Sequence, residues 1–227
     1  MERHFDASLR ELKEQLVSMA GLVELAIEAA TEALQKRDRE KIALVHDIER
    51  RVNAAHIAVD NSCVKLLALQ QPLAADLRLI VATIKINTDL ERMGDQAVNI
   101  AHNTERYIQG EPLKPLIDLP RMFDEVRVMV RETLDSFVRT DAALAREVLR
   151  RDDIVDGLKN KIFRDVLDHV KARPEHIEQG LNLILVARNL ERIGDHATNI
   201  AEDVIFAITG EDIRHSARVE TIKGALT

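Results

Sequence analysis

The chain contains two closely similar twelve-residue segments that begin one hundred positions apart. Leu90–Ala101 reads LERMGDQAVNIA and Leu190–Ala201 reads LERIGDHATNIA, so nine of the twelve letters are identical. The dipeptide Gly-Glu recurs with the same offset, at positions 110 and 210. A repeat of this kind indicates two copies of one structural unit, and it limits the possible folds more than any single motif does.

Each copy is predicted to contain three long helices. Apolar residues recur at intervals of three and four along nearly the whole chain, which is typical of amphipathic α-helices. Only 3% of the residues are aromatic although 46% are hydrophobic, so the composition favours helices over sheets. The predicted helices cover about 5–37, 40–70, 72–109, 121–140, 142–171, and the stretch after Arg173-Pro174 to about 208.

Several residues are expected to begin or end these helices. Pro72 suits the first turn of the third helix, and it pushes the preceding Gln71 away from helical geometry. Asp141 is a predicted N-terminal cap and Gly110 a predicted C-terminal stop, and the last helix is expected to end before Gly210. The resulting organisation is a first bundle over 1–110, a proline-rich linker over 111–120, a second bundle over 121–210 and a polar tail over 211–227.

Charge and composition exclude several classes of function. The net charge is −7 and the charges of both signs are interspersed, which argues against nucleic-acid binding. The single cysteine, Cys63, cannot form an internal disulfide, and we expect it to be a buried apolar residue. No apolar run reaches the roughly 18 residues of a membrane span, so we expect a cytoplasmic protein that meets a membrane only through partners.

Each repeated segment carries a Glu-x-x-x-Asp pair on its helix. The pairs are Glu91 with Asp95 and Glu191 with Asp195. Residues four apart lie only about 40° apart around a helix, so the two carboxylates share a face and repel each other by a few tenths of a kcal/mol. A glycine between the acids, Gly94 or Gly194, costs a helix about 1 kcal/mol relative to alanine. We expect this glycine to clear room for something bulky beside the carboxylates.

The second helix of each copy has a similar pair. Asp152 and Asp156 have the same spacing, and Glu49 with Asn53 is a weaker version of it. These pairs lie about 20 residues before the proline break, and the pairs on the third helix lie about 20 residues after it. Because consecutive helices in a bundle run antiparallel, the pairs should face each other. Oxygen ligands from two helices would suit a divalent or trivalent metal ion, without distinguishing Fe, Zn, Mn and Mg.

Three other interpretations stay open from the residues alone. Arg92 and Arg192 could form surface ion pairs with Asp95 and Asp195. The acidic faces could instead bind basic partner surfaces without metal. A di-metal carboxylate enzyme of ferritin-like type is disfavoured, because none of the eight histidines follows a glutamate by three residues. The histidines near the acidic pairs are expected to be polar packing residues; they are His46, His56 and His102.

The runs QQPLAADLRLI, TDLERMGDQAVNIA and ARNLERIGDHATNIAEDV together resemble the PhoU family, regulators associated with bacterial phosphate-specific ABC transporters. The resemblance covers essentially the whole chain. It implies an all-α fold of two tandem three-helix bundles related by pseudo-twofold symmetry. It also implies multinuclear metal clusters, with iron or another transition metal in some members. By position, the implied ligands are Glu49, Glu91, Asp95, Asp152, Asp156, Glu191 and Asp195, with Asn53 standing where an acid would be a better ligand.

The resemblance further implies a function. It predicts a negative regulator of phosphate uptake and of the phosphate-starvation response, without enzymatic activity. The implied partners are the ATPase subunit of the phosphate ABC transporter and a phosphate-sensing histidine kinase. A homodimer is a further expectation for a helical adaptor of this kind.

Overall fold

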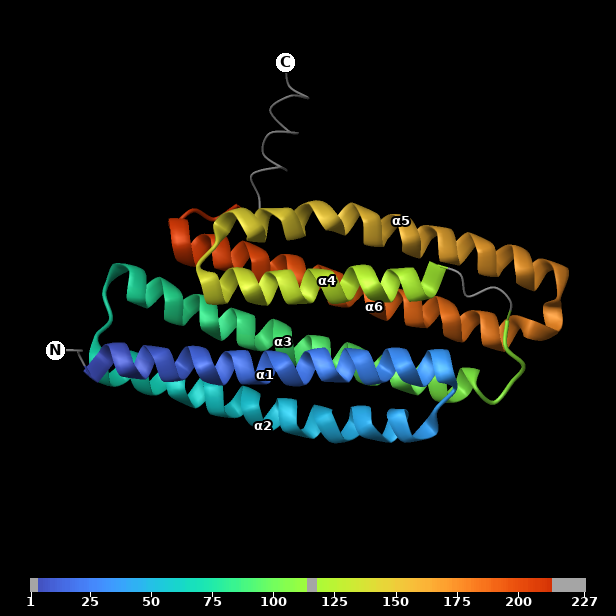
Figure 1. Cartoon of the computed structure of the whole chain (residues 1–227), viewed down its shortest axis with the longest axis horizontal. Coiled ribbons are helices and arrows are strands. Elements are labelled where there is room, and N and C mark those ends of the chain that lie inside the picture. The colour runs from blue at the N-terminus through green and yellow to red at the C-terminus, as the bar shows by residue number, and fades with distance from the viewer. Residues whose placement is uncertain (1–3, 114–117, 214–227) are drawn as a thin grey trace, which may run out of the picture.

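The computed structural model describes residues 4–113 and 118–213, and nearly all of these residues are helical (Figure 1). The helices are α1 (His4–Lys36), α2 (Arg39–Gln70), α3 (Ala74–Tyr107), α4 (Asp118–Arg139), α5 (Ala142–Ala172) and α6 (Ile177–Thr209), with one 3₁₀ turn, η1 (Pro174–His176), before α6. No strand occurs in the described ranges, and the predicted all-α class is confirmed. Most of the predicted tail, 214–227, and linker residues 114–117 lie outside the described residues.

The turn between the first two helices of each bundle is built in the same way twice. Arg37 and Thr140 adopt left-handed backbone, with φ of 54° and 57°. The next residue in each case, Asp38 or Asp141, accepts hydrogen bonds from the backbone N–H groups two and three positions later. Such a cap satisfies donors that the first helical turn leaves unpaired. The predicted cap at Asp141 is therefore confirmed.

The start of α3 differs from the prediction. Gln71 ends α2 in left-handed backbone at φ 45°, as expected for a residue that cannot continue the helix before Pro72. However, Pro72 does not lie in the first turn of α3. Leu73 after it is extended, with φ −115° and ψ 147°, so the helix can begin only at Ala74.

The linker also differs from the prediction at both ends. Helix α4 begins at Asp118 rather than near 121, because Pro120 fits a first helical turn, where no backbone N–H is needed. Helix α3 ends at Tyr107, and Gly110 is not its left-handed stop. A Cβ atom on Gly110 would lie 1.7 Å from Nε2 of Gln179 on α6, so the Gln179 side chain packs directly over this glycine. Gly210, with φ 79°, does terminate α6 as predicted.

The six helices form two three-helix bundles that lie side by side (Figure 1). Helices α3 and α6 pack against each other along the middle of the molecule, α1 also meets α4, and α2 and α5 lie outermost. The central pair is antiparallel, because Lys85 Nζ lies 3.0 Å from Asp203 Oδ1 while Asn199 Nδ2 lies 3.4 Å from Asp89 Oδ1. This arrangement agrees with a pseudo-twofold axis between the two copies.

One hydrophobic core runs through both bundles. It includes residues from all six helices, among them Leu90 and Leu190, which are both fully buried. The two sequence repeats are therefore packed as parts of a single hydrophobic interior. Within the described ranges, no helix has an apolar stretch long enough to cross a bilayer.

Polar contacts between the two bundles are not symmetric. The Asp89 carboxylate on α3 lies 2.8 Å from His196 Nδ1 on α6, and both side chains are largely buried. At the equivalent positions of the other copy the sequence has Asn189 and Gln96. The interface therefore carries an acid–histidine pair on one side of the axis and two amides on the other.

Candidate functional site

The glycines between the acidic residues face inward rather than toward an open space. Gly94 and Gly194 are buried. A Cβ atom on Gly94 would lie 3.3 Å from Val52 Cγ1 of α2, and one on Gly194 would lie 3.6 Å from Val155 Cγ1 of α5. The expectation that the glycine clears room for something bulky beside the carboxylates is thus wrong. Both glycines face the neighbouring second helix, tightly at Gly94 and with room for an ordinary contact at Gly194.

Val52 and Val155 show which residues of the two second helices are structurally equivalent. Because Val52 and Val155 meet the glycine in the same way, the residues around them are equivalent. Three positions earlier stand Glu49 and Asp152, and one position later stand Asn53 and Asp156. The predicted pairs on the second helices therefore do lie at the same height as the pairs on the third helices.

In the second bundle, four carboxylates from α5 and α6 share one region. Burial raises the pKa of Asp152 to about 6, and the nearby carboxylates of Asp195, Asp156 and Glu191 contribute to this rise. The pKa of Asp195 is also raised, by burial first and then by Glu191 and Asp156. Each charge disfavours its neighbours' ionised forms. A cation placed among these carboxylates would relieve their mutual repulsion.

A lysine that the sequence reasoning missed relieves part of this repulsion. Lys159 Nζ lies 2.6 Å from Glu191 Oε1 and 2.8 Å from Asp156 Oδ1, so it bridges α5 and α6. Hydrogen bonds to these two carboxylates raise the pKa of Lys159 to about 12. Its position three residues after Asp156 places it on the same helix face, and this spacing was the available signal.

In the first bundle the equivalent region has three carboxylates, Glu49, Glu91 and Asp95. Asn53 Nδ2 donates a hydrogen bond to Glu49 Oε1 at 2.5 Å. Burial raises the pKa of Asp95, and the Glu49 carboxylate across the α2–α3 boundary adds to the rise. Glu49 and Asp95 are therefore electrostatic neighbours, as the helix register requires.

The donor types fit a hard or borderline metal ion, because carboxylate oxygens from two rigid helices face a shared region in each bundle. The side chains as they stand do not form a coordination shell. No group of three or more acidic, histidine or cysteine side chains within residues 4–113 and 118–213 is arranged to hold a metal ion. In the second bundle, Lys159 forms ion pairs with two of the four carboxylates. In the first bundle, the Asn53 amide donates a hydrogen bond to one of the three.

The alternative pairings expected from the sequence are resolved by the structure. Neither Arg92 nor Arg192, both exposed and described, forms an ion pair with the aspartate three residues later. His56 packs as expected for a polar structural residue, with Nδ1 3.3 Å from the Asn87 carbonyl oxygen. Cys63 is fully buried, and burial raises the pKa of its thiol to about 12. A thiol in this environment stays protonated and is a poor nucleophile.

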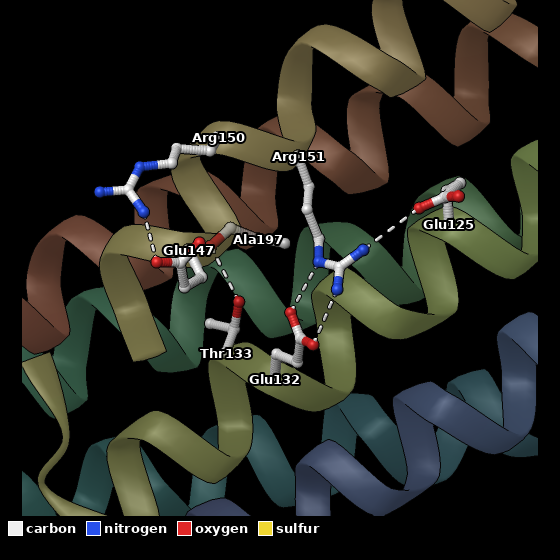
Figure 2. A network of polar contacts seen from close by, with 7 residues as sticks. All are labelled: Glu125, Glu132, Thr133, Glu147, Arg150, Arg151 and Ala197. Carbon is white, nitrogen blue, oxygen red and sulfur yellow. Dashed lines mark hydrogen bonds and ion pairs between the residues drawn. The ribbon is translucent and has the colours of Figure 1, made fainter. Parts of the chain in front are cut away.

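Helix α5 is held in place by an arginine adjacent to the acidic pair (Figure 2). Arg151 donates to both carboxylate oxygens of Glu132 on α4, at 2.8 Å from Nε and 3.1 Å from Nη2. Its Nη1 also lies 3.4 Å from Glu125 Oε2. A forked arginine–carboxylate contact fixes direction as well as distance. It therefore ties α5 to α4 at the residue next to Asp152.

These observations define a class of protein: a duplicated, all-helical bundle with one acidic region between the second and third helices of each copy. The PhoU domain family model matches residues 16–104 and 119–204, which are the two bundles. This chain belongs to the PhoU family.

Related proteins and solved structures cover nearly the whole chain. A phosphate-specific transport system accessory protein PhoU homolog from Pseudomonas putida is 38% identical over 95% of this chain and 84% of its own length. The homolog from Aquifex aeolicus is 40% identical over 91% of this chain and 94% of its own. The crystal structure of PhoU from Pseudomonas aeruginosa matches with a TM-score of 0.88 at 37% identity, covering 92% of this chain and 100% of that one.

A second solved structure has the same fold at lower identity. The phosphate transport system regulatory protein PhoU from Streptococcus pneumoniae matches with a TM-score of 0.86 at 27% identity, covering 92% of this chain and 99% of that one. The helical arrangement is thus shared with both solved PhoU proteins.

Proposed function

We propose that this chain is an accessory protein of a bacterial phosphate-specific transport system and a negative regulator of phosphate uptake and of the phosphate-starvation response. The observation that carries the proposal is the match to PhoU proteins across both bundles. Relatives are named as accessory proteins of that transport system, and a solved neighbour is named as a regulatory protein of it. These names support a binding role, and we propose no catalytic activity.

The proposed partners are the ATPase subunit of the phosphate transporter and a phosphate-sensing histidine kinase, with the chain acting as a cytoplasmic homodimer between them. The long exposed faces of the outermost helices α2 and α5 support this role, because they offer surface on both sides of the molecule (Figure 1). In phosphate-replete cells, we expect the complex to keep both uptake and kinase signalling low.

Metal binding is the proposed mechanism by which the chain presents its surface to partners. The residues that would hold an ion in the second bundle are Asp152, Asp156, Glu191 and Asp195, and those in the first bundle are Glu49, Glu91 and Asp95, with the Asn53 side-chain oxygen as a weaker donor. A bound divalent or trivalent ion would neutralise these acids and join the second helix to the third. The relative position of those helices would then be part of the surface that partners read.

A metal-free interaction scaffold is the second candidate function. It is favoured by the ion pairs of Lys159 with Asp156 and Glu191, which neutralise part of the acidic region without any ion. In this alternative, the remaining carboxylates contact basic residues of a partner directly. Metal analysis of protein purified without chelator distinguishes the two candidates.

The regulatory role is tested in a bacterium that lacks its own PhoU protein and carries a reporter for the phosphate-starvation response. We expect the wild-type chain to restore repression in phosphate-rich medium and to co-purify with the transporter ATPase and the kinase. Failure to restore repression, with the protein folded and expressed, would contradict the proposed role.

The metal part is tested with the double variant Glu91→Gln/Asp95→Asn. We expect it to lose the metal bound in the first bundle and to weaken both partner binding and repression. The matched control is Asp124→Asn/Glu147→Gln, which removes two exposed carboxylates elsewhere. Loss of metal from the first bundle with unchanged partner affinity and repression would show that this ion does not set the partner surface.

A further inference from the structure

The second acidic region contains a positive charge that belongs to the chain itself. Lys159 contacts one carboxylate from each helix, Asp156 on α5 and Glu191 on α6. These are two of the four acids proposed to hold a metal ion. An ammonium group cannot coordinate a metal, and its charge repels one. A metal ion and Lys159 Nζ therefore compete for the same oxygen atoms.

The first acidic region lacks this competitor. By the register of the two valines, the residue equivalent to Lys159 is His56. His56 points its ring toward the Asn87 carbonyl oxygen and Asp60, at 3.3 Å and 3.6 Å, and not toward Glu49 or Asp95. The first region therefore has three carboxylates and no lysine, whereas the second has four carboxylates and one lysine.

We propose that Lys159 is a built-in counter-cation that must be displaced before the second acidic region binds a metal ion. This inference rests on the proposed metal binding and deepens it, because it makes the two regions unequal. A metal ion can bind the first region without displacing a charged side chain of the chain itself. The second fills only with the release of Lys159 from Asp156 and Glu191.

The structure offers a place for the released side chain. A surface hollow of about 290 Å³ between α5 and α6 is lined by Lys159 and Glu191 themselves and, farther along, by Asn160, Phe163, Ile184, Ala187 and Arg188. The flexible stem of lysine can lie over apolar surface while its ammonium group stays in water. Metal binding would therefore move a positive charge from between the helices to the α5–α6 surface.

The first experiment measures Mn²⁺ binding by isothermal titration in the Glu91→Gln/Asp95→Asn background, which leaves the second region as the site observed. We expect Lys159→Met, which keeps the stem and removes the repelling charge, to bind Mn²⁺ about five- to tenfold more tightly. Lys159→Arg keeps a positive charge and should bind no more tightly than the parent. The matched control is Lys161→Met, because Lys161 pairs with Asp118 at 2.7 Å and does not touch the acidic region.

The second experiment uses the unmodified chain, so it does not depend on how a variant folds. Lysines are acetylated briefly with and without Mn²⁺, and the modified sites are quantified by mass spectrometry. Lys159 is engaged by two carboxylates and should react several-fold faster once Mn²⁺ releases it. Lys161 on the same helix should react at the same rate in both conditions.

The outcomes separate the two levels of the proposal. Tighter Mn²⁺ binding by Lys159→Met, with Mn²⁺-dependent labelling of Lys159, supports the inference. If the parent binds Mn²⁺ but Lys159→Met binds equally or more weakly, the inference is wrong while the metal site itself stands. If neither the wild-type chain nor Lys159→Met binds Mn²⁺, both the inference and the proposed metal binding are overturned.

Discussion

The two bundles place acidic residues at equivalent heights but compensate their repulsion differently. In the first bundle one acid is replaced by Asn53, whose amide donates to Glu49. In the second bundle all four acids are present, and Lys159 bridges two of them. With the lysine counted, both regions carry the same formal charge of −3. The comparison teaches that a repeated motif can keep its electrostatic balance while the residues that provide it diverge.

The first way to test the comparison asks whether the two bundles are separable at all. Leu90→Ala and Leu190→Ala each remove a fully buried side chain, so each should lower the free energy of unfolding by about 3 kcal/mol. Because one core connects the bundles, both variants should still unfold in a single transition by circular dichroism and calorimetry. Two separate transitions, with only one of them shifted, would show independent domains.

The second test concerns repulsion among the acids of the second bundle. The pKa of Asp152 is raised to about 6, whereas an unfolded aspartate titrates near 3.9. Between these pH values the folded chain binds more protons than the unfolded chain, so this group's contribution to stability increases as the pH falls from 7 to 4. Asp152→Asn should therefore stabilise the metal-free protein at pH 7 by about 1 kcal/mol, allowing for solvent screening, and change little at pH 4.

The measurement is urea denaturation at both pH values with chelator present. Glu49→Gln in the first bundle is the matched control, and it should change stability less because Glu49 accepts the Asn53 hydrogen bond. Destabilisation by Asp152→Asn at pH 7 would mean that the acids of the second bundle are not under mutual repulsion.

The third test compares the two buried glycines. Alanine should gain up to about 1 kcal/mol of helix propensity at either position. At Gly194 the added Cβ would make an ordinary contact with Val155 Cγ1 at 3.6 Å, so Gly194→Ala should stabilise the protein. At Gly94 the added Cβ would lie 3.3 Å from Val52 Cγ1, and the required shift should offset most of the gain. Thermal denaturation of both variants tests the difference, and equal effects would show that the two helix contacts are equally tight.

The smallest expected effect comes from making the first region more like the second. Asn53→Asp replaces a hydrogen bond to Glu49 with a like-charge pair four residues apart, which should cost about 0.3–0.5 kcal/mol. The additional carboxylate should increase Mn²⁺ affinity at the first region, measured with the second region disabled by Glu191→Gln/Asp195→Asn. Unchanged affinity would indicate that Asn53 does not face the same space as Glu91 and Asp95.

Most of the fold follows from local sequence signals. The helix-forming composition, the Asp141 cap and Gly210 in left-handed backbone are each set by residues within one turn of the helix end. The duplicated segment indicated two bundles and placed acids from adjacent helices at one height. The start of α3 was less predictable, because the extended backbone of Leu73 is not dictated by Pro72 alone.

The features that sequence reasoning did not reach depend on contacts between distant residues. Gly110 lies against the side chain of Gln179 on α6, and nothing near position 110 indicates this contact. Likewise, Gly94 and Gly194 could have bordered an open space or a neighbouring helix, and only packing decides between the two. Lys159 shares a face with Asp156, but its contact with Glu191 depends on the separation of α5 and α6.

The Asp89–His196 pair has a consequence for how a duplicated chain avoids mistaken assembly. If two first halves from different molecules met through α3, the symmetry of the contact would place Asp89 opposite Gln96 instead of a histidine. Two second halves meeting through α6 would place His196 opposite Asn189. Only contact between a first half and a second half brings Asp89 next to His196. The divergence at these positions therefore favours the pairing of a first half with a second half over the pairing of two like halves.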